Sequence, residues 1–115
     1  MRTQNKQIIT NGDLSGNVTA PAILLENIYG YSVQAVLTGS PVGSIKLQAS
    51  DDEGTDLIGG GVTNWTDITE SITAVTTSGN IIWNVTSSFY RWARVVYVFT
   101  SGSGTLNARF NIKGL

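Results

Sequence analysis

Two residue types that carry much of enzyme and metal chemistry are missing from this chain of 115 residues, which contains no cysteine and no histidine. Without cysteine there is no disulfide framework, no thiolate nucleophile and no zinc–thiolate site. Without histidine, a Ser-His-Asp triad and a Cys-His dyad are both impossible. We therefore expect no catalytic residue and no enzymatic activity. Stability has to come from packing, from strand pairing or from a partner subunit.

Charge is also scarce, because charged residues make up 13% of the chain and the net charge is −1. This balance argues against a nucleic-acid binder and against a polybasic membrane module. No apolar run approaches the roughly 20 residues of a transmembrane helix. The N-terminal segment MRTQNKQIIT lacks the apolar centre of a secretory signal, so we expect synthesis in the cytoplasm. A neutral surface of Thr, Ser, Asn and Gly suits close packing in an assembly.

The acidic residues gather in one Gly-rich segment, DDEGTDLIGGGVT, which begins at Asp51. Clustered carboxylates could hold calcium, but this run lacks the alternating spacing and the distant bidentate Glu of a calcium loop. None of the carboxylates sits inside an apolar strand, where the raised pKa of a general acid would be expected. We predict solvated carboxylates in a mobile surface loop or a small protruding hairpin, with no metal and no cofactor.

Elsewhere the chain alternates between apolar and polar residues with a period of two, which is typical of half-buried strands. The predicted inward residues are Tyr31, Val33, Ala35, Leu37, Ile45, Leu47, Ala49, Leu106, Ala108, Phe110 and Ile112. Clusters of Gly, Ser, Asn and Pro separate these runs and indicate turns. In particular, SGSG predicts a hairpin between the last two runs.

The turn signals predict strands at 6–10, 19–26, 31–38, 43–50, 64–69, 71–76, 80–86, 90–99 and 104–113. We therefore predict an all-β fold: a single antiparallel β-sandwich or jelly-roll-like domain of eight or nine short strands. Residues 1–18 would form an N-terminal arm and the first strand, and residues 19–115 the sandwich.

The segment YRWARVVYVF (90–99) is apolar on both faces, so it should be central in a sheet. Its second face needs a cover, which could be a loop or another subunit. The neutral surface favours a subunit, so we predict a homo-oligomer, a trimer or a dimer. Arg91, Trp92 and Arg94 are the predicted partner contacts, through ion pairs or cation–π contacts. Alternatively, the two arginines are strand-edge charges that discourage aggregation.

Arg2 and Lys6 complete the predicted contacts, because the polar leader MRTQNKQ could add as a strand to a neighbouring subunit. A frayed terminus is the alternative. The aromatic residues Trp65, Trp83 and Trp92 also leave two interpretations open, a sugar-stacking platform or packing in the core. We favour packing, because Trp is common in cores and in cross-strand pairs.

Four longer stretches form one recognisable pattern: GYSVQAVLTGSPVGSIKLQASDD, NWTDIT, GNIIWNV and YRWARVVYVFTSGSGTLNARFNIKG. Together they resemble a family of small bacteriophage and prophage structural proteins. The resemblance covers residues 30–114 and includes Trp65, Trp83, Tyr90-Arg91, Arg94 and the GTLN at 104–107. In this chain the insertion at 51–63 replaces the short turn usual in the family, which removes support for any function carried by that loop.

The resemblance implies a virion component, made in the cytoplasm of a host bacterium. We predict a capsid decoration or minor capsid protein whose partners are its own copies and the major capsid protein. A carbohydrate-binding or host-adhesion module on the virion surface or tail is the alternative, with a glycan as its partner.

Overall fold

The computed structural model describes residues 2–25, 28–56, 60–85 and 90–114. These residues form eight strands and one short 3-10 helix, η1, and every strand pair is antiparallel. The bounds are β1 Arg2–Asp13, β2 Val18–Thr19, β3 Ile23–Leu24, β4 Ile28–Ser50, β5 Thr66–Asp67, η1 Thr69–Ser71, β6 Thr73–Val75, β7 Gly79–Val85 and β8 Trp92–Gly114. The predicted all-β class is confirmed. Within these described ranges, no helix is long and apolar enough to cross a membrane.

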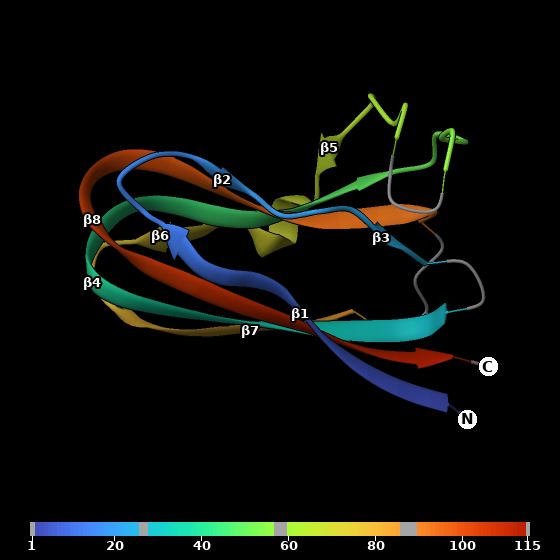
Figure 1. Ribbon diagram of the computed structural model, residues 1–115, viewed down its shortest axis with the longest axis horizontal. Coiled ribbons are helices and arrows are strands. Elements are labelled where there is room, and N and C mark those ends of the chain that lie inside the picture. The colour runs from blue at the N-terminus through green and yellow to red at the C-terminus, as the bar shows by residue number, and fades with distance from the viewer. Residues whose placement is uncertain (1, 26–27, 57–59, 86–89, 115) are drawn as a thin grey trace.

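Strands β4 and β8 form one long two-stranded ribbon that bends in its middle and so contributes to both layers of a sandwich. Each strand has 23 residues, and the pairing runs from Ile28 opposite Gly114 to Ser50 opposite Trp92. Figure 1 shows the two strands turning over together at the end of the molecule opposite the chain termini. The predicted strand number is confirmed at eight, but two of the strands are long.

We call the two layers sheet I and sheet II. Sheet I contains, in order, β1, residues 104–114 of β8, residues 28–38 of β4, and β7. Sheet II contains β2 and β3 along one edge, then residues 92–99 of β8, then residues 43–50 of β4, with β5 and β6 along the other edge. The ribbon is continuous through the bend, so all eight strands belong to one hydrogen-bonded sheet.

The bend corrects the hairpin predicted at SGSG. Residues 90–99 and 104–113 are not partners of each other, because both pair with β4, on opposite sides of the bend. The glycines of β4 and β8 at this point allow the ribbon to bend. Gly39 and Gly102 adopt φ of 86° and 82°, and a Cβ on Gly102 would collide with the Ser40 carbonyl. Glycine therefore lets the two backbones approach while the ribbon turns.

A one-residue bulge in β8 keeps both halves of that strand pointing into the core. Val42 pairs with Ser101 and Gly43 with Phe99, so Thr100 is the extra residue. Odd-numbered residues face inward before Thr100 and even-numbered residues after it, because one extra residue reverses the side-chain alternation. The bulge therefore explains why the core residues of β8 are odd-numbered before the bend and even-numbered after it.

The core lies between the two sheets and consists mainly of the residues that alternation predicted. The buried members of that set are Tyr31, Val33, Ala35, Leu37, Ile45, Leu47, Ala49, Leu106, Ala108 and Phe110. Rings of Tyr31 and Phe110 meet with centroids 5.1 Å apart. The segment 90–99 is central in sheet II, as predicted, between β4 on one side and β2 and β3 on the other.

The polar leader forms the first strand of sheet I. β1 begins at Arg2 and pairs with the C-terminal half of β8 in its own chain, from Arg2 opposite Gly114 to Asp13 opposite Thr105. The leader therefore occupies an edge of sheet I of its own chain, whereas the two possibilities considered for it were addition to a neighbouring subunit and a frayed terminus.

Candidate functional site

The five predicted partner contacts fall into two groups on different sheets. Arg2 and Lys6 belong to β1 of sheet I, and Lys6 is exposed. Arg91, Trp92 and Arg94 lie at the start of β8, in sheet II. The core lies between the two sheets and separates the two groups. They do not form one continuous contact surface.

Trp92 needs a correction, because its side chain is 0% exposed within this chain. Its indole Nε1 donates a hydrogen bond to the backbone oxygen of Asp52 at 2.9 Å. A Cβ placed on Gly54 would lie 3.1 Å from the Trp92 ring, so that backbone passes directly over it. The acidic loop of the chain itself covers the second face of this strand at Trp92. A partner subunit, which we had predicted as the cover, cannot reach this side chain.

Asp52 holds the loop in this position. Its carboxylate accepts hydrogen bonds from the backbone N–H of Thr63 at 2.8 Å and of Asn64 at 3.0 Å, and from Asn64 Nδ2 at 2.9 Å. The Asn64 side chain, then the backbone N–H groups of Asn64 and Thr63, lower the pKa of Asp52 to about 2. The carboxylate thus closes the loop across the gap between its two ends. Asp52 and Gly54 thus lie on sheet II at Trp92, while Glu53, Thr55 and Asp56 are exposed, as expected of a surface loop.

The two arginines also bind within their own chain. Arg94 lies with its guanidinium carbon 4.1 Å from the centroid of the Trp65 ring, and its Nε donates to Gln48 Oε1 at 2.8 Å. Burial lowers the pKa of Arg94. Arg91 Nε donates to the backbone oxygen of Glu53 at 3.1 Å. The cation–π contact predicted for this segment therefore exists, but it joins β8 to the loop of the same chain.

The three tryptophans have different roles. Trp83 is buried and donates a hydrogen bond to the Ser71 backbone oxygen at 2.9 Å, and Trp92 is buried beneath the loop. Packing, the favoured interpretation, is thus confirmed for these two. Trp65 is half-buried beneath Arg94, which occupies one face of its ring. The three rings do not form a shared sugar-stacking platform.

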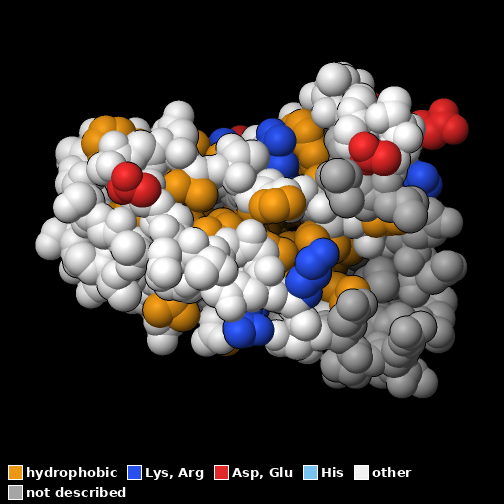
Figure 2. Space-filling view, in the orientation of Figure 1, with side chains coloured by type: hydrophobic (Ala, Val, Ile, Leu, Met, Phe, Trp, Pro, Cys, Tyr) orange, Lys and Arg blue, Asp and Glu red, His pale blue; other side chains and the backbone are white. Residues whose placement is uncertain are grey.

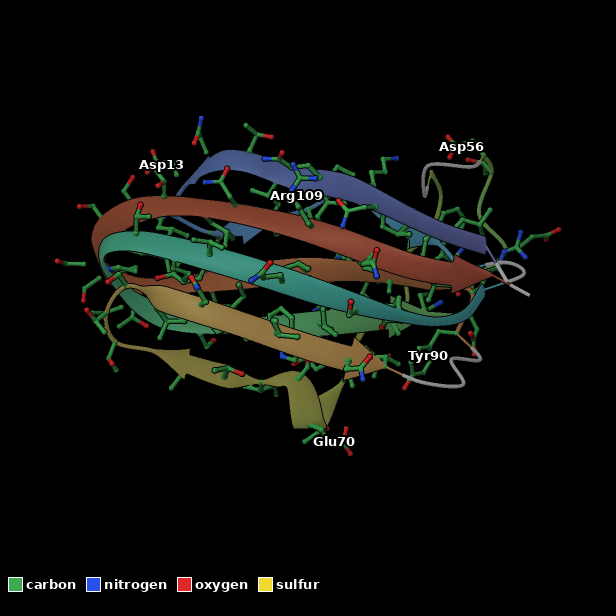
Figure 3. The ribbon with its side chains drawn as sticks, turned by 90° about the horizontal axis from the view of Figure 1, so that it is seen from below. Asp13, Asp56, Glu70, Tyr90 and Arg109 are labelled. Carbon is green, nitrogen blue, oxygen red and sulfur yellow. The ribbon has the colours of Figure 1, made fainter. Side chains whose placement is uncertain are left out.

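A depression of about 360 Å³ opens beside the loop, at the β5 end of sheet II. It is lined by Ala49, Ser50, Asp51, Asn64, Thr66, Asp67, Ile68, Thr69, Glu70 and Tyr90. The side chain of Tyr90 is partly exposed, at 37%. Figure 3 shows Tyr90 and Glu70 on the same side of the molecule, away from Asp13 and Arg109. Carboxylates, an amide and hydroxyls beside a phenol ring can form hydrogen bonds with a ligand rich in hydroxyl groups.

The charges of the depression are partly used within the protein. Asp67 accepts hydrogen bonds from Gln48 Nε2 at 2.8 Å and from Lys46 Nζ at 2.9 Å, and these lower its pKa, with Gln48 the larger cause. In the described parts of the chain, no three carboxylates come together as metal ligands would. Asp51 also accepts from the Arg91 backbone N–H at 3.0 Å. Two of the three carboxylates that line the depression therefore already accept hydrogen bonds within the protein.

Sequence reasoning missed two features of this region. One is the structural role of Asp52, whose partners lie 11 and 12 residues away along the chain and follow no local pattern. The other is the depression, which combines residues of β4, β5, η1 and the segment before β8. The acidic cluster was a visible signal, but its spacing does not indicate which carboxylate binds backbone N–H groups.

No protein-family model and no curated relative matches the sequence. Among solved structures, the SPBc2 prophage-derived protein YomS is similar over 96% of this chain and 96% of its own, with a TM-score of 0.56 and 12% identity. PirA is similar over 96% and 93%, with a TM-score of 0.53 and 15% identity. Tripeptidyl peptidase 2 matches 97% of this chain with 10% of its own, with a TM-score of 0.56 and 11% identity. At such identities the likeness shows the fold alone: an all-β sandwich that also occurs in a prophage-derived protein.

Proposed function

We propose that this chain is a non-enzymatic structural protein of a bacteriophage virion, and within the virion a capsid decoration or minor capsid protein. Its partners would be copies of itself and the major capsid protein, with neither nucleic acid nor membrane involved. The observation that carries the proposal is the fold shared with prophage-derived YomS over 96% of both chains. The family resemblance of residues 30–114 points in the same direction.

The distribution of charge supports a structural role. Lys46, Arg94 and Arg109 all bind side chains of their own chain. Figure 2 shows few charged side chains, scattered among uncharged ones, on one face of the molecule. A surface of this kind excludes neighbours weakly, so copies can pack closely on a shell. Such a protein contributes by occupying lattice positions and needs no reacting group.

The test uses virions of a phage that carries this gene and virions of the same phage with the gene deleted. We expect the protein in many copies in the purified parental virions, by quantitative mass spectrometry. Purified protein added to the deletion virions should bind to saturation and appear at regular lattice positions by electron cryomicroscopy. Absence of the protein from purified virions, or failure to bind the shells, would overturn the proposal.

A glycan-binding module is the second candidate, and the depression beside Tyr90 is the observation that favours it. An adhesin of this kind would bind oligosaccharides of the host surface through Tyr90, Glu70 and Asp51. In a glycan array and in calorimetry, Tyr90→Ala should then abolish binding without changing the melting temperature, because Tyr90 is partly exposed. Val98→Ala, at an exposed site on the outer face of sheet II, is the matched control. If no oligosaccharide binds the wild-type protein, this candidate is rejected.

A further inference from the structure

A sandwich has strand edges whose backbone N–H and C=O groups can pair with another chain, and proteins usually protect them. Along the edges of sheet II, the strands are very short. β2 and β3 have two residues each on one side, and β5 and β6 have two and three on the other. Edge strands of this length offer little backbone for another chain to pair with.

In sheet I, the β1 edge is protected in a different way. β1 is long, but it carries Arg2, Lys6 and Asp13, and its register shifts twice, between Gln7 and Ile9 and between Ile9 and Gly12. Charged side chains and bulges are the usual devices that stop an edge strand from pairing with another chain.

The β7 edge of sheet I has none of these devices. Its seven residues, GNIIWNV, include no charge and no proline. They pair with β4 without a register shift, from Gly79 opposite Leu37 to Val85 opposite Tyr31. Within the part of the chain that the structure describes, the β7 backbone forms hydrogen bonds with β4 alone. Figure 3 shows β1 and β7 on opposite sides of sheet I.

One side chain on β7 is exposed without an intramolecular reason. Ile82 is 66% exposed, and its cross-strand neighbour on the outer face of sheet I is Gln34, an exposed polar residue. On the same face of β7, Asn80 and Asn84 stand two residues before and after Ile82. The outward pattern is therefore Asn, Ile, Asn, which reads the same in both directions.

We propose that β7 pairs antiparallel with β7 of a second copy, about a two-fold axis at Ile82. In this register Ile82 faces Ile82 of the second copy, and each Asn80 faces an Asn84. Cross-strand pairs of β-branched residues and of neutral polar residues are favourable, and no like charges meet. Sheet I continues across the axis from one copy to the other, and the contact is isologous, as in most dimers.

A second copy is the occupant that fits, because the strand is complementary to itself in shape, charge and order of residues. A foreign strand would not need the symmetry of Asn80 and Asn84 about Ile82. The inference rests on the proposed self-association of this chain, and it identifies the strand responsible. It does not depend on where in the virion the protein lies.

The test is sedimentation equilibrium of the wild-type protein and of variants at Ile82. The wild type should form a dimer, and I82K should raise the dissociation constant by about tenfold or more, because two lysines would then face each other at the axis. I82E should do the same. An equimolar mixture of I82K and I82E should recover the dimer, because the opposite charges then face each other. V98K is the matched control, a lysine at a 38% exposed site on sheet II, and should sediment as the wild type.

The mixture of I82K and I82E tests both the register and the two-fold symmetry. It restores the dimer only if residue 82 of one copy faces residue 82 of the other. A wild-type protein that is monomeric at about 1 mM, an I82K variant that dimerises normally, or a mixture that stays monomeric would each overturn the inference. The shell-binding test is separate. A monomeric protein that still decorates shells would refute the β7 interface and leave the virion role standing, and a β7 dimer that ignores shells would do the opposite.

Discussion

The two edges of sheet I are built from the same chain on the same layer, yet their chemistry differs. β1 has twelve residues, three of them charged, and a register that shifts twice, whereas β7 has seven uncharged residues in regular register. In a chain with so few charges, their placement is informative. Charges and bulges protect the edge that should stay unpaired, and the edge without them is the one we assign to a partner.

The two strands are also attached differently. β1 is fixed by Ile9, a single isoleucine in the core, and by hydrogen bonds from Arg109 to Asn5 at 2.8 Å and to Gln7 at 3.1 Å. β7 is fixed by Trp83, which is buried in the core and bonded to Ser71. The buried anchor of the docking edge is therefore a larger side chain than that of β1.

Replacing the anchor of β7 should have the largest effect. Trp83→Ala is expected to lower the free energy of unfolding by about 3–5 kcal/mol, because a large buried ring is removed and the Ser71 oxygen keeps only one of its two donors, Thr73 Oγ1. Trp83→Phe keeps most of the packing and should cost less. Chemical denaturation measures both. A loss below about 1 kcal/mol for Trp83→Ala would show that β7 is not held as described.

Ile9→Ala is the matched change on β1, and it should cost about 2–4 kcal/mol. Its effect on association is the more useful comparison. Trp83→Ala should weaken the dimer because it loosens the docking edge, while Ile9→Ala should leave the dissociation constant unchanged at temperatures where the monomer stays folded. If Ile9→Ala weakens the dimer more strongly, the roles of the two edges have been assigned the wrong way round.

Lowering the pH should destabilise the end of β1 and the loop at Asp52 but not β7, and this effect should be smaller than that of the core substitutions. Hydrogen bonds from Ser15 lower the pKa of Asp13, at the end of β1, and those from Asn64 and Thr63 lower the pKa of Asp52 to about 2. Carboxylates of unfolded chains titrate near pH 3.9. The stability that these groups contribute is therefore complete above about pH 5 and is lost as the pH falls through their folded pKa values.

We expect the amides of Ser15, Thr63 and Asn64 to lose protection between about pH 4 and pH 2. β7 has no titratable side chain, so its amides that bond to β4 should stay protected until the whole protein unfolds. Amide exchange followed by NMR at stepwise lower pH measures this. Asp52→Asn should remove the pH dependence at Thr63 and Asn64, and unchanged protection there at pH 2 in the wild type would contradict the role of Asp52.

The smallest expected effect concerns the side-chain contacts across β1. Arg109 is exposed, so Arg109→Gln should lower the free energy of unfolding by about 1 kcal/mol or less, although it removes the hydrogen bonds to Asn5 and Gln7. In Arg109→Gln, the amides of β1 should exchange faster than in the wild type, while the amides of β7 should exchange at the same rate. Faster exchange in β7 would indicate that the two edges open together.

Much of this fold can be read from the sequence, because alternation with a period of two depends on neighbouring residues. The inward sets 31–37, 45–49 and 106–110 were predicted correctly for that reason. The bend was not, because TGSPVG and TSGSGT contain the residues that hairpin turns also use. The pairing of β4 with β8, between residues far apart in sequence, decides that each strand continues through the bend and does not fold back on itself as a hairpin.

The candidate site could be predicted less well. The sequence indicated that Trp92 needs a cover, but the choice between a loop and a subunit depended on whether the described parts of the loop, 51–56 and 60–65, fold back. Asp52 makes them fold back, through contacts with Thr63 and Asn64 that no local pattern indicates. The β7 edge was equally hidden, since a strand can be recognised as an edge only when all its partners are known.

The most direct test of the difference between the two edges is amide exchange measured over a range of protein concentrations. If β7 is the docking strand, its amides that do not bond to β4 should exchange more slowly as the concentration rises through the dimer dissociation constant, and they should return to fast exchange in I82K. The outward amides of β1 should exchange at the same rate at every concentration. Concentration-independent exchange in β7, or a concentration-dependent slowing in β1, would contradict this account.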